Sequence, residues 1–184
     1  AIRNKQLFRY GYDLPAAEQG PMSSTLERSF CEKMKVDYAL GVTSGSAALD
    51  VALSALGVGP GDEIIVAAWS WISDYTAVAR LGARPVLAEI DKSFCLDPSE
   101  IARLSNARTK AIIVVHYQGV VADMDVILAE AQKVGVPVLE DCAQSPGAMY
   151  KGRRSGSMGA MGIYSFHFQK LITAGEGGMV VTND

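Results

Sequence analysis

The segment KAIIVVHYQGVVADMDVILAEAQKVGVPVLED, residues 110–141, contains the pattern that decides the fold. It opens with an apolar run at 110–116, continues at 123–135 with helical spacing that ends at a glycine, and closes with a second apolar run at 136–141. A short strand that is apolar throughout is typical of a parallel sheet covered on both faces. We therefore predict a strand–helix–strand unit within a mainly parallel sheet.

The same alternation extends over most of the chain. A strand and turn are expected at 38–45, further strands at 63–70 and 84–90, and helices at 23–35, 46–57, 72–82 and 97–105. The tail differs, because apolar strands at 159–167 and 177–184 are joined by a glycine-rich connection. We predict a three-layer α/β/α domain over residues 23–184, preceded by a polar arm over residues 1–22.

Composition excludes several classes of function. The chain has 184 residues, 49% of them hydrophobic and 20% charged, with a formal net charge of −3. This balance is typical of a globular protein and argues against a nucleic-acid-binding surface, and no apolar stretch is long enough to cross a bilayer. Cys31, Cys95 and Cys142 are widely spaced, which fits reduced thiols in a cytoplasmic protein and gives no metal site.

Ligands of such sheets bind at the carboxyl ends of the strands, so the residues that follow each strand are the candidates for a site. In TSGSAAL, residues 43–49, Gly45 and Ser46 lie where a strand turns into a helix. Backbone N–H groups and the positive end of the helix would hold an anion there. The alternative is that Ser46 only caps the helix.

Three residues at other strand ends suit a flat, protonated ring. Trp71 has the right shape to stack on a heterocycle, although tryptophan here could equally belong to the core. Asp141 could pair with a protonated ring nitrogen, the alternative being a helix cap, and Gln144 could reach a ring oxygen.

Lys170 stands in YSFHFQKLITAGEGG, residues 164–178, between two apolar strands. A partly desolvated lysine can form an imine with an aldehyde, although a lysine in a loop is more often exposed. An anion cradle, a ring stacker, an acid and an amine together indicate pyridoxal 5′-phosphate.

Four stretches carry a resemblance to a known family. They are SGSAALDVALSALGVGPGDEIIVAAWSWIS at 44–73, RTKAIIVVHYQGVVADMD at 108–125, VLEDCAQSPGAMYKGRRSGSMG at 138–159 and IYSFHFQKLITAGEGGMVVTND at 163–184. They resemble the DegT/DnrJ/EryC1/StrS aminotransferases, sugar and cyclitol aminotransferases of the aspartate-aminotransferase fold type I. The resemblance covers nearly the whole chain.

The resemblance implies a role for each candidate. Lys170 matches the Schiff-base lysine, Asp141 the partner of the pyridine nitrogen, and Gln144 the residue near the ring oxygen. The remaining matches are Gly45, Ser46 and Ser165 in the phosphate cradle and Trp71 stacked on the ring.

The resemblance also implies a reaction. An amino group would pass from glutamate or glutamine to a keto sugar or keto cyclitol in antibiotic or amino-sugar biosynthesis. A dehydratase branch of the family has histidine in place of the lysine, so Lys170 favours transamination. A sugar dehydratase, an aminohydroxybenzoate synthase or a non-catalytic half-subunit that stabilises a partner are the alternatives.

Chains of this family are about twice as long as this one. By the resemblance, the rest of the large domain and the small C-terminal domain are absent after Asp184. We expect a homodimer, with a separate chain carrying the C-terminal half as the favoured way to complete the site.

Overall fold

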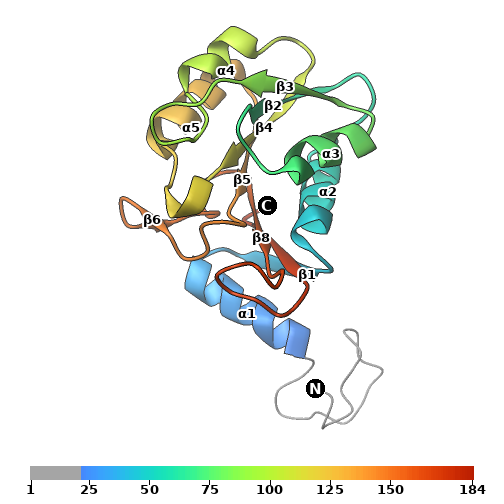
Figure 1. Ribbon diagram of the computed structural model, residues 1–184, viewed down its shortest axis with the longest axis vertical. Coiled ribbons are helices and arrows are strands. Elements are labelled where there is room, and N and C mark those ends of the chain that lie inside the picture. The colour runs from blue at the N-terminus through green and yellow to red at the C-terminus, as the bar shows by residue number, and fades with distance from the viewer. Residues whose placement is uncertain (1–21) are drawn as a thin grey trace.

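The computed structural model describes residues 22–184, so the arm expected at 1–22 lies almost wholly outside the described residues. A seven-stranded sheet forms the centre of the molecule (Figure 1). Its strands, in spatial order, are β1 (Tyr38–Val42), β9 (Gly178–Thr182), β8 (Met161–Ser165), β5 (Val138–Asp141), β4 (Thr109–Val115), β2 (Glu63–Ala67) and β3 (Arg84–Ala88). Every described pairing in it is parallel except those of β9, which runs antiparallel to both β1 and β8. The α/β fold with a mainly parallel sheet is therefore confirmed.

Helices cover both faces of the sheet, as the apolar strands require. The described helices are α1 (Met22–Met34), α2 (Gly45–Ala55), α3 (Ile72–Arg80), α4 (Ser99–Leu104) and α5 (Met124–Val134). Figure 1 shows α2 and α3 on one side of the sheet and α4 and α5 on the other. Successive residues of a strand point to opposite faces, so Ile64 and Val66 pack with α2 and α3, whereas Ile65 and Ala67 pack with α4 and α5.

A third apolar cluster joins α1 to the end of the sheet that contains β8 and β9. Phe30 of α1 makes edge-on contacts with the rings of Tyr164 and Phe166, at centroid distances of 5.3 and 5.6 Å. Tyr164 is buried and its hydroxyl donates to the carbonyl oxygen of Ser155. Aromatic packing thus holds the first helix against the sheet, together with a hydrogen bond of 2.8 Å from the backbone N–H of Gly41 to Oε1 of Glu27.

One small feature of the fold was not expected from the sequence. Strands β6 (Met149–Tyr150) and β7 (Arg153–Arg154) form a hairpin whose turn residues, Lys151 and Gly152, both have positive φ angles, 47° and 81°. Such a turn favours glycine or asparagine at both positions, and lysine at the first hides the signal. A single turn of 3₁₀ helix, Tyr117–Gly119, follows β4. None of the helices within residues 22–184 is long and apolar enough to cross a membrane.

Candidate active site

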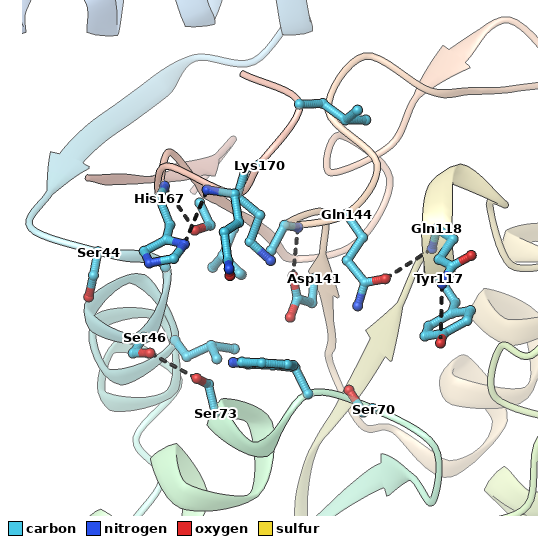
Figure 2. A pocket seen from close by; sticks show the side chains of 18 of the residues that line it. Ser44, Ser46, Ser70, Ser73, Tyr117, Gln118, Asp141, Gln144, His167 and Lys170 are labelled. Carbon is cyan, nitrogen blue, oxygen red and sulfur yellow. Dashed lines mark hydrogen bonds between the residues drawn. The ribbon is translucent and has the colours of Figure 1, made fainter. Parts of the chain in front are cut away.

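A cavity of about 850 Å³ opens at the carboxyl ends of the central strands. It is lined by the start of α2, by the loop between β2 and α3, by the ends of β5 and β8, and by the loop after β8. All seven residues singled out in the sequence line it: Gly45, Ser46, Trp71, Asp141, Gln144, Ser165 and Lys170. Figure 2 shows Asp141, Gln144 and Lys170 on one side of the space and Ser46 on another.

The first turn of α2 forms one wall of the cavity. Ser44, not Ser46, caps the helix, because the Ser44 hydroxyl accepts a hydrogen bond of 3.0 Å from the backbone N–H of Ala47. The suggestion that Ser46 only caps the helix is therefore wrong. Its hydroxyl instead lies 2.9 Å from that of Ser73 on α3, so a second hydroxyl stands beside the helix terminus (Figure 2).

Two glycines let the backbone come close together at this wall. A Cβ atom on Gly45 would lie 2.7 Å from the Cβ of Ser165, and one on Gly178 would lie 2.4 Å from the carbonyl oxygen of Ser44. This close approach also buries Ser165, at the end of β8, against the start of α2. Residues with side chains at either position would push α2 away from the sheet and open the cradle.

Asp141 ends β5 and is only 5% exposed. The backbone N–H of Ala143 donates to its Oδ1 at 2.7 Å, and no helix follows, so the helix-cap alternative is wrong. Burial raises the pKa of the Asp141 carboxyl, while the hydrogen bond from Ala143 and the charge of Lys170 act in the opposite direction. A cation placed against this carboxylate would favour its ionised form.

Lys170 lies in the loop between β8 and β9, partly buried in the wall of the cavity. Its backbone N–H donates to the carbonyl oxygen of His167 at 2.9 Å, and its Nζ lies 5.9 Å from the centre of the Trp71 ring. The positive charge of Lys170 acts on the carboxyl of Asp141, so the amine and the acid share one space. The alternative of an exposed loop lysine is therefore wrong.

Trp71 precedes α3 and is 60% exposed, which excludes the alternative that it belongs to the core. The Oε1 of Gln144 accepts a hydrogen bond of 3.1 Å from the backbone N–H of Gln118, so this amide is oriented at the rim of the cavity (Figure 2). A flat ligand would find an aromatic face and an oriented amide in the same cavity.

Several residues around the site escaped the sequence analysis. Ser73, Tyr117 and Gln118 line the cavity but belong to no strand–helix motif that distinguishes them. Asp74 is more informative: it is completely buried on the face of α3 that also carries Ala77 and Val78. The sequence did carry a signal for Asp74. Residues 74, 77 and 78 fall on one face of a helix, so the pattern places an acid on the apolar face of α3.

The DegT/DnrJ/EryC1/StrS aminotransferase family matches residues 13–184. The chain belongs to this family. It is 43% identical, over 157 residues, to the L-glutamine:2-deoxy-scyllo-inosose aminotransferase of Micromonospora echinospora, covering 85% of this chain and 37% of that protein.

Solved structures of aminotransferases agree with this fold. 3-Amino-5-hydroxybenzoic acid synthase superposes with a TM-score of 0.85 at 42% identity, over 88% of this chain and 42% of that one. Spr1654 of Streptococcus pneumoniae, in its PLP form, gives a TM-score of 0.86 at 30% identity, over 90% of this chain and 46% of that one. The chain thus spans less than half the length of these relatives, and its mainly parallel α/β fold matches part of these fold type I structures.

Pyridoxal phosphate, the cofactor of the family, presents an anionic phosphate, a ring nitrogen that takes up a proton, and an aldehyde. The residues of the cavity fit all three. The close approach at Gly45 leaves a cradle that a side chain would fill, Asp141 is a buried carboxylate without a salt-bridge partner among the described residues, and Lys170 supplies an amine. The expected cofactor is therefore consistent with the chemistry of the site as well as with the family.

Proposed function

We propose that the protein is a pyridoxal-phosphate-dependent aminotransferase that moves an amino group from glutamate or glutamine to a keto sugar or keto cyclitol. The observation that carries the proposal is the meeting of Lys170, Asp141 and the start of α2 in one cavity of about 850 Å³. A binding module or a scaffold would need no amine opposite a buried acid. The related aminotransferase of Micromonospora echinospora and the aminohydroxybenzoate synthase support a role in antibiotic or amino-sugar biosynthesis.

Each residue has a distinct task in this proposal. Gly45, Ser46 and Ser165 would hold the phosphate, because N–H groups at a helix N-terminus and hydroxyl donors stabilise an anion. Trp71 would cover one face of the ring, and the Gln144 amide, already oriented by Gln118, would stand near the ring oxygen.

When bound, pyridoxal phosphate accepts the electron pair of the donor's α-carbon into its protonated ring. Asp141 would hold the proton on the ring nitrogen, since a buried carboxylate and a cation stabilise one another. Nζ of Lys170 would first fix the cofactor and, once freed by the incoming amine, would carry a proton from the donor's α-carbon.

We also propose that the cavity is completed by a further surface in a homodimer. Phe168, Leu171 and Ile172 lie beside it and are 64, 81 and 48% exposed. Such apolar side chains around a catalytic cavity are stabilised when another surface covers them. The three cysteines are all unpaired, which supports a cytoplasmic location.

The lysine assignment is tested by trapping the cofactor. Reduction with borohydride after incubation with pyridoxal phosphate should leave a pyridoxyl group on the peptide that contains Lys170, detected by mass spectrometry. Lys170→Ala should lose both this adduct and the absorbance near the edge of the visible range. Lys151→Ala is the matched control, because Lys151 is exposed and paired with Asp125.

Either of two results would contradict the proposal: an adduct on another lysine, or full amino-donor turnover by Lys170→Ala. Addition of glutamate or glutamine to the loaded protein should discharge the visible band. A band that persists with every amino donor would point to the non-catalytic half-subunit.

A further inference from the structure

Asp74 is a buried acid that the proposed reaction does not use. It is completely buried, as the third residue of α3, and it does not line the cavity, although Ser70 and Ser73, which precede it, do. An isolated ionised carboxylate in such a place is costly, so its partners decide whether it carries a proton.

The two oxygens of Asp74 differ in their surroundings. Oδ2 accepts a short hydrogen bond from the hydroxyl of Ser70. Oδ1 is buried and accepts a hydrogen bond from none of the described residues. An oxygen that accepts nothing is satisfied if it carries a proton and donates it. Asp141 is the partner for that proton, since a side-chain hydrogen bond between the two carboxyl groups raises the pKa of Asp74 and lowers that of Asp141.

The charged groups around the pair place the proton on Asp74. Burial raises the pKa of Asp74 well above its ordinary value, and the negative charge of Asp141 raises it further, against the hydrogen bond from Ser70 and the charge of Lys170. Asp141 is favoured as the ionised partner, because Ala143, Asp74, Lys170 and His116 all act to lower its pKa. Two carboxyl groups this close cannot both ionise without a large cost, so they share one proton.

We propose that Asp74 is a positioning residue, whose protonated carboxyl donates a hydrogen bond to the Asp141 carboxylate and holds it, ionised and oriented, toward the cavity. The part of this inference that concerns the cofactor rests on the proposed function. The hydrogen bond itself does not, since it is a property of the chain without any ligand. Asp141 would thus reach the ring nitrogen already desolvated and fixed, which spares binding the cost of ordering it.

Two substitutions separate the hydrogen bond from the space that the side chain fills. Asp74→Asn keeps a donor of the same shape, whereas Asp74→Leu keeps the volume and removes the donor. Asp50→Asn is the matched control: the same change on the neighbouring helix α2, at an acid paired with Arg80 on the outside of the protein.

The first measurement needs no cofactor. Carbon-13 NMR of labelled aspartate carboxyl groups should show Asp74 protonated at neutral pH. The pKa of Asp141 should stay unchanged in Asp74→Asn and rise in Asp74→Leu. An Asp74 that titrates near 3.8, its ordinary value, would overturn the inference, whatever the reaction proves to be.

The second measurement uses the protein loaded with pyridoxal phosphate. Asp74→Leu should weaken cofactor binding by about ten-fold or more, because a hydrogen bond to a charged group is lost, and Asp74→Asn should restore most of it. Equal weakening in both variants would mean that Asp74 only fills space and would refute the positioning role. If Asp74→Leu does not fold, the titration of Asp74 in the unaltered chain and of Asp141 in Asp74→Asn still tests whether Asp74 is protonated and donates to Asp141. If instead the wild-type protein bound no cofactor while Asp74 titrated as expected, the proposed function alone would fail.

Discussion

Glu140 and Asp141 are neighbours in β5, yet their side chains serve different parts of the molecule. Because side chains alternate along a strand, Asp141 faces the cavity and Glu140 faces away from it. Glu140 accepts a hydrogen bond of 2.9 Å at Oε2 from Nε2 of His116, whose Nδ1 accepts from the backbone N–H of Ala122. It also accepts from the backbone N–H groups of Gly156, Met158 and Gly159, at 2.8, 2.6 and 2.6 Å.

These contacts explain why Glu140 stands beside Asp141 at the end of a buried strand. Glu140 orders the segment before β8 by accepting hydrogen bonds from three of its backbone donors. His116 and Cys142 lie close to it, but the histidine nitrogens and the carboxylate are occupied by hydrogen bonds, so this cluster holds the backbone rather than a metal. His116 has a supporting role, because both of its ring nitrogens are engaged in hydrogen bonds within this cluster.

Glu140→Gln should destabilise the protein by about 3 kcal/mol or more, because an amide group would point a donor at backbone donors and leave them unpaired. Urea unfolding, followed by circular dichroism, measures this loss. Glu130→Gln, at a partly exposed position on α5 paired with the exposed Lys133, is the control and should change stability by less than about 0.5 kcal/mol. Equal stability of the two variants would show that Glu140 does not order the segment.

At the level of strands, Glu63 ties together the starts of β2, β3 and β4. Its side chain is buried and accepts hydrogen bonds from Asn106, Arg84 and Arg108 at 2.9, 2.6 and 2.6 Å. The hydrogen bond from Asn106, followed by that from Arg84, lowers the pKa of Glu63 to about 2. The residues that precede parallel strands are thereby joined at the edge of the sheet opposite the cavity.

This depressed pKa makes part of the stability depend on pH. The native carboxylate holds its proton less tightly than the unfolded one, so its stabilisation is present above pH 4.5 and is lost as the pH falls toward 2. Glu63→Gln should lower the free energy of unfolding at pH 7, and the gap from wild type should close on acidification. Unfolding in urea at several pH values measures this, at low salt, because both arginines are largely exposed and screened by ions. A gap of constant size would rule out the carboxylate as its cause.

At the scale of the whole domain, three apolar clusters pack against the same seven-stranded sheet. Two lie between the central strands and the helix pairs α2–α3 and α4–α5, and the third lies under α1. Since strands such as β5 contribute to more than one cluster, loss of packing at one end is felt along the sheet. The molecule is therefore expected to unfold as one cooperative unit.

Phe30→Ala tests this cooperativity. The ring is partly buried against Tyr164 and Phe166, so its removal should cost about 2 kcal/mol, with the denaturant dependence of unfolding unchanged. Phe94→Ala, which removes a ring that is 54% exposed, should have a much smaller effect. An altered slope, or a separate early transition for α1, would show that the third cluster unfolds on its own.

Local patterns were enough to predict the layers, the nearly parallel sheet and the residues that line the site, because apolar runs, helical spacing and strand ends can all be read within short segments. The seven candidate residues were found this way and meet in one cavity. Local pattern did not reveal that Ser44 rather than Ser46 caps α2, that Trp71 is exposed, or that Asp74 lies against Asp141. Those facts depend on which side chains from distant segments approach each other and how much water remains between them. Burial and charge at a site are sums over such neighbours, so the different surroundings of Asp74 and Asp141 become visible only in the folded molecule.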